Sequence, residues 1–187
     1  MSINDLLNVM PPHVGAGVSV DWHTLERAWG TGFPADYKAF IEHYGPGAIE
    51  NFLAVFVPTL DEVGRPAGEM AEESWVARDE WESEGLAGVD ADPDQLLAWA
   101  TDGTADLLCW LRTDGSPDDW PVLVYERGRD TWQLYHCGMV EFLIRIFRAE
   151  LPRHPLSGTP LWAVERPRFL TGPEQRRIRA TGQDPWE

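Results

Sequence analysis

The chain contains few cysteines, which build disulfide frameworks, and few lysines, which contact phosphate. Its 187 residues include two cysteines, Cys109 and Cys137, and a single lysine, Lys38. Two cysteines far apart in sequence show no metal-ligand spacing, so we expect buried reduced thiols, with a strand-to-strand disulfide as the alternative. No stretch approaches the roughly 20 apolar residues of a membrane span, and the N-terminus lacks the pattern of a signal peptide. The sequence therefore predicts a soluble, cytoplasmic protein.

Basic residues are also scarce relative to acidic ones. The chain has 15 Lys and Arg against 31 Asp and Glu, for a formal net charge of −16. Such a surface repels nucleic acid and anionic lipid, because both require neutralisation of phosphate, and it attracts basic partners at long range. We therefore expect neither nucleic acid nor a membrane as a partner, and the charge favours a basic protein.

The motifs that indicate common catalytic or cofactor sites are absent. The sequence has no Walker A loop, GxGxxG, HExxH, GxSxG or CxxC pattern. His136 precedes Cys137, but we place both in mid-strand of an acidic protein, which favours packing over a reactive thiolate. The run TDGSPDDW at 113–120 lacks the spacing of a calcium loop and indicates a solvated hairpin tip. We predict no catalytic residue, no metal ion and no cofactor, and hence a protein that is not an enzyme.

The stretch 96–137 indicates the central sheet. Four apolar or β-branched runs, at 96–101, 105–113, 120–127 and 131–137, are separated by turn-forming DG, GSPDD and RGRD clusters. Short connections of this kind predict an antiparallel meander. Each run carries one tryptophan, and together these four residues are expected to supply much of the core: Trp99, Trp110, Trp120 and Trp132.

Helical periodicity flanks this predicted meander on both sides. Apolar spacing and capping residues predict helices over 3–9, 22–29, 34–44, 67–84 and 139–150. The apolar run 48–57 predicts two short strands interrupted at Asn51. The fold class is therefore α+β, with N-terminal helices, an antiparallel-rich sheet and a C-terminal helix packed on it. We divide the chain into an N-terminal extension (1–20), an α+β domain (21–151) and a Pro/Arg-rich tail (152–187) that is partly folded back.

Most of the charge imbalance lies in residues 61–94, which contain 12 acidic residues against Arg65 and Arg78. In the helix predicted there, Trp75 lies among charged positions, as an interface anchor would. The alternative is that this helix buries a wider face. The predicted partner-binding residues are Glu72, Glu73, Trp75, Asp79, Glu80 and Glu82.

Two blocks, 22–58 and 96–143, resemble the SUKH superfamily, which includes yeast cell-wall assembly regulators and many bacterial proteins. In the first block the resemblance rests on Trp22, Glu26, Gly30, Pro34, Tyr37, Tyr44, Gly45 and Gly47. In the second it rests on Trp99, Asp102, Trp110, Asp118, Trp120 and Pro121. The chain departs from the family in having Gly-Thr-Ala-Asp where a Gly-Asp pair is common, and Gly138 where Ser or Thr is common.

The resemblance implies an α+β domain without catalytic residues. Many bacterial members look like immunity proteins, which bind and neutralise a toxin encoded beside them, often a nuclease or deaminase. We therefore expect a cognate toxin as the partner, and the net charge of −16 favours a basic, nuclease-like one. The alternative is a regulatory or scaffold protein that binds another cellular protein and has no link to a toxin.

Overall fold

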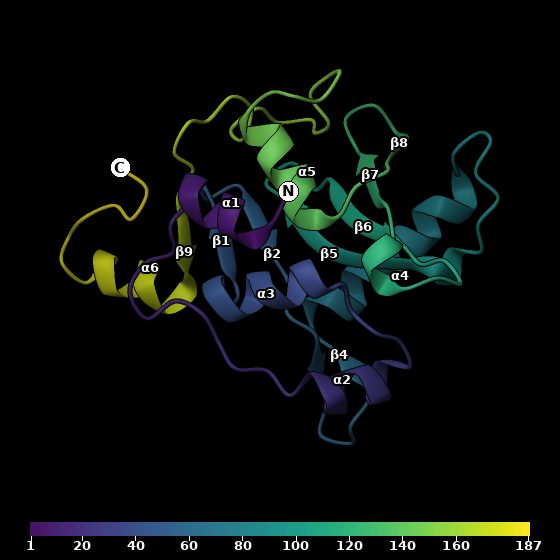
Figure 1. Ribbon diagram of the computed structural model, residues 1–187, viewed down its shortest axis with the longest axis horizontal. Coiled ribbons are helices and arrows are strands. Elements are labelled where there is room, and N and C mark those ends of the chain that lie inside the picture. The colour runs from purple at the N-terminus through teal and green to yellow at the C-terminus, as the bar shows by residue number, and fades with distance from the viewer.

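The computed structural model describes residues 1–187 as a seven-stranded sheet with helices on both faces (Figure 1). The helices are α1 (Ile3–Val9), α2 (Trp22–Trp29), α3 (Ala35–Tyr44), α4 (Glu69–Ser83), α5 (Met139–Phe147) and α6 (Gly172–Arg179), with short 3-10 turns η1 (Pro93–Gln95) and η2 (Pro117–Asp119). The strands are β1 (Gly47–Ile49), β2 (Leu53–Val55), β3 (Thr59–Leu60), β4 (Pro66–Ala67), β5 (Leu96–Asp102), β6 (Leu107–Leu111), β7 (Val122–Glu126), β8 (Thr131–Tyr135) and β9 (Phe169–Thr171). The predicted α+β class is confirmed.

The sheet has the strand order β8-β7-β6-β5-β2-β1-β9, and every neighbouring pair is antiparallel. Strands β5 to β8 form the predicted meander. The run 48–57 forms the hairpin of β1 and β2, whose turn places Glu50 and Asn51 at positive φ. We did not predict β9, which adds to the sheet beside β1. Its three residues lie between prolines and a glycine. So short a run shows no alternation of apolar and polar residues from which a strand could be predicted.

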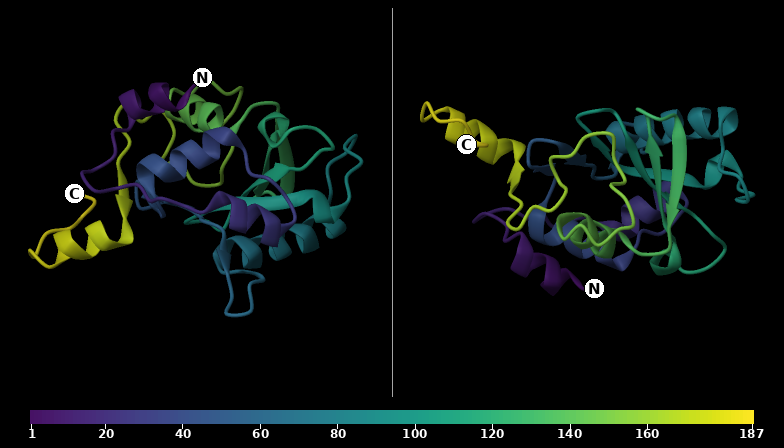
Figure 2. Two further views of the ribbon diagram at one scale, coloured as in Figure 1. Left: turned by 60° about the horizontal axis from the view of Figure 1, so that its bottom comes forward. Right: turned by 90° about the horizontal axis from the view of Figure 1, so that it is seen from above.

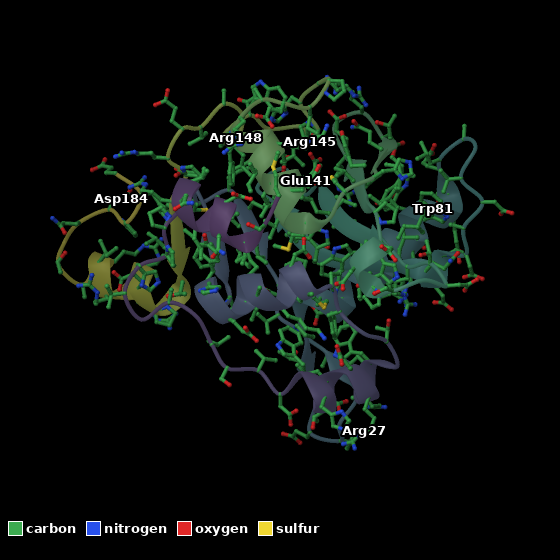
Figure 3. All side chains as sticks on the ribbon, viewed as in Figure 1. Arg27, Trp81, Glu141, Arg145, Arg148 and Asp184 are labelled. Carbon is green, nitrogen blue, oxygen red and sulfur yellow. The ribbon has the colours of Figure 1, made fainter.

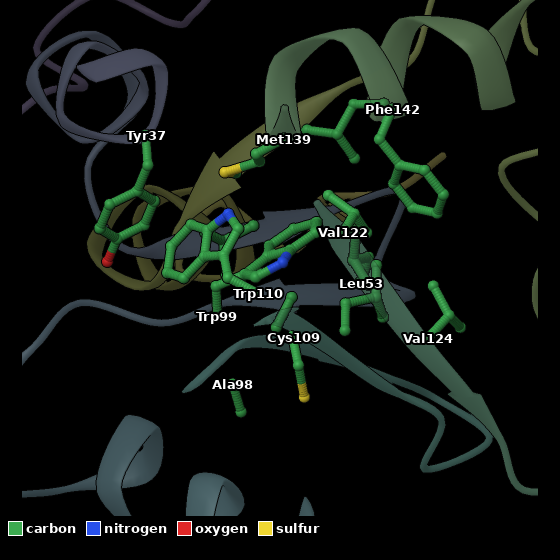
Figure 4. Close-up of a cluster of buried hydrophobic side chains, with 14 of the residues drawn as sticks. Tyr37, Leu53, Ala98, Trp99, Cys109, Trp110, Val122, Val124, Met139 and Phe142 are labelled. Atoms are coloured by element: carbon green, nitrogen blue, oxygen red, sulfur yellow. The ribbon is translucent and has the colours of Figure 1, made fainter. Parts of the chain in front are cut away.

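Helices α1, α3 and α5 lie on one face of the sheet and α4 lies on the other (Figure 2). Side-chain size on β5 and β6 matches this arrangement. Ala98 and Cys109 are paired in register and point toward α4, where small side chains allow the helix to approach closely (Figure 4). On the α3 and α5 face, Trp99 packs against Phe142, with ring centroids 6.5 Å apart. Burial of these two faces supplies most of the stabilising apolar area.

All four meander tryptophans are buried, as predicted. Trp22 and Trp29 of α2 are half-buried and pack their rings against Phe33. The two thiols are both free, and burial raises the pKa of Cys137 to about 11, so that it stays protonated at neutral pH. No helix is both long enough and apolar enough to cross a membrane.

Two aspartates tie the helices to the sheet connections. The Asp118 carboxylate in η2 accepts a hydrogen bond of 2.6 Å from the Ala35 N–H at the start of α3. Asp36 in turn accepts a hydrogen bond of 3.0 Å from the Val140 N–H at the start of α5. Each carboxylate therefore satisfies an N–H that a helix leaves unpaired at its first turn. The stretch 113–120, which we expected to be only a solvated hairpin tip, thus holds the first turn of α3.

Candidate functional site on α4

The six predicted partner-binding residues all lie on α4, and the helix divides them between two faces. Glu72, Trp75, Asp79 and Glu82 recur at helical spacing on the outward face and are exposed. Glu73 and Glu80, seven residues apart, are half-buried and lie nearer the sheet. The opposite side, formed by Met70, Ser74, Ala77 and Trp81, is buried as predicted.

Glu80 is occupied within the protein itself. It forms an ion pair of 3.1 Å with Arg127 and accepts a hydrogen bond of 3.1 Å from the Tyr125 hydroxyl. Burial together with the neighbouring carboxylates raises the pKa of Tyr125, which therefore stays protonated. Burial also raises the pKa of Glu73. Glu80 thus joins α4 to β7 and the turn after it. Glu73 is half-buried without an ion pair, and the other four residues face solvent.

A groove of about 420 Å³ lies between α4 and η1. It is lined by Trp75, Arg78, Asp79, Glu82, Asp92, Pro93 and Asp94. Sequence analysis identified Trp75, Asp79 and Glu82 but missed Arg78 and the three residues of η1 and its N-cap. The available signal was the D-P-D-Q stretch, in which Asp92 and Gln95 form a capping box. That pattern predicts a local turn, but not that the turn packs beside Trp75.

Contacts between α4 and the segment that contains η1 fix the two walls of the groove relative to each other. From α4, the Trp81 indole N–H donates to the Ala91 carbonyl oxygen at 3.0 Å, and Arg78 pairs with Asp94 at 3.4 Å. Trp81 is labelled in Figure 3. At the N-cap of η1, the Asp92 carboxylate accepts a hydrogen bond from the Asp94 N–H at 2.9 Å. These contacts fix the position of α4 relative to η1, so the two walls are in place before a ligand enters.

Trp75 is 66% exposed, and it is the one aromatic residue among the five large hydrophobic side chains that are exposed. The other nine tryptophans are buried or half-buried. Beside it, Asp79 and Glu82 form no ion pair, and their carboxylates accept no hydrogen bond. An exposed indole is among the side chains that are enriched at the centres of protein interfaces.

A second group of carboxylates is buried and serves the fold. Asp106 is fully buried and accepts hydrogen bonds of 2.8 Å from the Arg127 N–H and from the Ser157 hydroxyl. Glu126 pairs with Arg129 at 2.6 Å. The Asp106 bond to Ser157 and a Glu126–Arg153 pair of 3.9 Å fasten this end of the meander to the segment that follows α5. No group of three or more His, Cys, Asp or Glu side chains in the structure is arranged to hold a metal ion.

We expect Asp102→Asn to stabilise the protein at neutral pH. Asp102 Oδ1 accepts hydrogen bonds from Thr104 and from the Asp106 N–H, while Oδ2 is buried without a partner. Burial raises the pKa of Asp102 above its ordinary value of 3.8, so the charge opposes folding at every pH above the folded-state pKa. Asparagine keeps the accepting oxygen and removes the charge.

Thermal unfolding of the Asp102→Asn variant measured between pH 3 and pH 8 checks this expectation. The gain in melting temperature should be full at neutral pH, shrink as the pH falls through the folded-state pKa, and vanish below the unfolded-state value. Asp102→Ala is the control, because it removes the charge together with the three hydrogen bonds and should destabilise. A gain that grows toward acid pH would contradict the argument.

The protein is thus an α+β sheet protein that presents a preformed, acidic, aromatic groove on one helix. A protein-family model described as SMI1-KNR4 cell-wall (SUKH_6) matches residues 20–143, which is more than half of the chain. The chain belongs to this family, and the predicted membership in the SUKH superfamily is confirmed. A search of curated proteins and a search of solved structures gave no match.

Proposed function

We propose that this protein is a non-catalytic, immunity-type protein that binds and neutralises a cognate toxin. The observation that carries the proposal is the exposed Trp75 beside unpaired carboxylates on a preformed groove. Family membership supports a role in binding another protein. In this proposal the partner is a basic, nuclease-like toxin, the complex forms in the bacterial cytoplasm, and bound protein covers the toxin's active site or a surface next to it.

The charge distribution supports attraction of a basic partner toward α4. The outward face of α4 carries Glu72, Asp79 and Glu82, and the net charge of the chain is −16. The arginine-bearing α6 lies at the opposite end of the molecule, near the tail residue Asp184 (Figures 1 and 3). A basic protein approaching this molecule is therefore turned toward α4 before contact, which raises the association rate. Glu80 adds little to this field, because its charge is paired with Arg127.

Trp75 is the proposed anchor of the interface. A large, rigid aromatic side chain that becomes desolvated on binding contributes more than the charged residues around it, because exposed ion pairs are screened by salt and water. The carboxylates then act mainly on the rate of encounter and on the choice of partner.

Co-expression with the product of the adjacent upstream reading frame tests the proposal. We expect a salt-sensitive 1:1 complex in a pull-down, and rescue of growth when that product is toxic. Absence of a complex with a toxic neighbour would overturn the toxin-binding role. If the neighbour is harmless and no complex forms, a regulatory or scaffold role is favoured instead. This role is the second candidate because the family description refers to the cell wall.

Substitution of Glu72, Asp79 and Glu82 together by alanine is expected to slow association with the toxin about tenfold at low ionic strength. The slope of the association rate against salt concentration should also become flatter, because three charges no longer attract the partner. Stopped-flow measurement of the association rate over a series of salt concentrations checks both expectations.

A matched control removes the same charge elsewhere. Asp114, Asp119 and Glu165 are exposed and lie outside α4, so their joint replacement by alanine changes the net charge equally. We expect a smaller effect on the association rate from this variant. Equal rates for the two triple variants would mean that only net charge matters and that the α4 face is not the docking surface.

A further inference from the structure

The groove beside Trp75 combines an aromatic face and free carboxylates within about 420 Å³. Asp79 follows Trp75 by four residues and Glu82 follows it by seven, so all three lie on one face of α4. Asp92 and Pro93 line the facing wall. A side chain entering the groove therefore meets an indole and carboxylates together.

The one cation in the groove does not neutralise Asp79 or Glu82. Arg78 pairs with Asp94 at 3.4 Å and donates to the Leu96 carbonyl oxygen at 3.4 Å. These contacts direct its guanidinium toward η1 and the start of β5. The carboxylates of Asp79 and Glu82 remain free for a cation from outside the molecule.

We infer that this groove binds one arginine side chain of the basic partner, stacked on Trp75 and paired with Asp79 and Glu82. The inference deepens the proposed function and rests on it. A guanidinium is planar, so it stacks on an indole face while its N–H fork reaches carboxylates. It is also less strongly hydrated than an ammonium group, so it loses less on leaving water. A lysine ammonium carries the same charge but has neither the planar face nor the paired N–H donors of a guanidinium.

Titration of the full-length, ¹⁵N-labelled protein with short capped peptides tests the inference. Three pentapeptides differ only at the central residue, which is arginine, lysine or citrulline, the neutral isostere of arginine. The probe is the indole N–H resonance of Trp75, which is assigned by its absence from the Trp75→Leu spectrum. The arginine peptide should shift this resonance with saturation, the lysine peptide should bind about threefold to fivefold more weakly, and the citrulline peptide should not saturate.

Two charge-removing variants show whether the groove carboxylates are responsible. Asp79→Asn with Glu82→Gln should weaken binding of the arginine peptide about fivefold, since it removes two exposed charge pairs. Glu62→Gln with Glu69→Gln removes equal charge from exposed positions that do not line the groove, and should leave binding close to wild type.

Three results would overturn the inference: no shift of the Trp75 resonance, equal affinity for the arginine peptide and either of the others, or equal weakening by the two double variants. These failures are separable from failure of the proposed function. If the toxin complex forms but the arginine peptide leaves Trp75 unshifted, the arginine site is wrong and toxin binding stands. If the peptide binds as expected but no toxin complex forms, the groove's chemistry is supported and the toxin-binding role is wrong.

Discussion

Replacing Asp106 with alanine is expected to lower the free energy of unfolding by about 3–5 kcal/mol, among the largest effects of any single polar substitution in this protein. The Asp106 carboxylate is fully buried and accepts hydrogen bonds from the Arg127 N–H, the Ser157 N–H and the Ser157 hydroxyl. Alanine removes the shared acceptor of these three donors, which lie at the edge of the core. The loss also releases the segment after α5 from the turns of the meander, since Asp106 joins the two.

Equilibrium unfolding in urea measures this loss directly. Ser157→Ala is the graded control, because it removes the hydroxyl and keeps the backbone N–H contact to Asp106, so about 1–2 kcal/mol is expected. Ser157 also accepts a hydrogen bond from the Gly128 N–H at 3.0 Å, which this variant removes as well. A loss below 1 kcal/mol for Asp106→Ala would mean that water or a rearranged segment replaces the carboxylate.

Replacing Trp110 with alanine is expected to destabilise the protein by about 3–5 kcal/mol through the cavity that it leaves. Trp110 is fully buried. The centroid of its ring lies 4.9 Å from the ring centroid of Tyr37 and 5.9 Å from that of Trp99 (Figure 4). Both neighbours are held by their own helix or strand, so the space cannot be filled by a small movement. Trp110 therefore joins the helical layer to the sheet.

Trp75→Ala is the matched comparison, since it deletes the same side chain from the surface. Trp75 is 66% exposed, and we expect the free energy of unfolding to change by about 0.5 kcal/mol or less. The same variant should weaken binding of the partner if Trp75 is the proposed anchor. A large loss of stability on Trp75→Ala, measured by the same urea titration, would assign the side chain to folding and remove it from the proposed interface.

Local patterns predicted most of the elements because short-range interactions dictate them. Gly30 ends α2 in a left-handed conformation, and Asp21 caps its start, both as the sequence indicates. The turn at Glu50 and Asn51 likewise interrupts the run 48–57 where an asparagine tolerates positive φ. By contrast, β9 is a strand only because β1 lies beside it. Pairing with a distant segment leaves no local signal in three residues.

The candidate site was predictable in part for the same reason. Helical spacing alone separates Trp75 from the buried Trp81, because residues six apart on a helix point in different directions. Spacing did not show that Glu80 is taken by Arg127 and Tyr125, 45 or more residues away. Nor did it show that Asp92 and Asp94 would stand across from Trp75. Those relations depend on how β5 to β8 pack against α4.

The sequence by itself determined helices α1 to α5, the meander, the aromatic core and the concentration of charge on α4, since each follows from periodicity, turn residues and composition. The tertiary structure alone decided which of those charges are free. It placed Glu73 and Glu80 toward the sheet, left Asp79 and Glu82 unpaired, and closed a groove around Trp75 with η1. A carboxylate's partner is set by the segments that meet across the core, and such long-range contacts have no counterpart in the local pattern of residues.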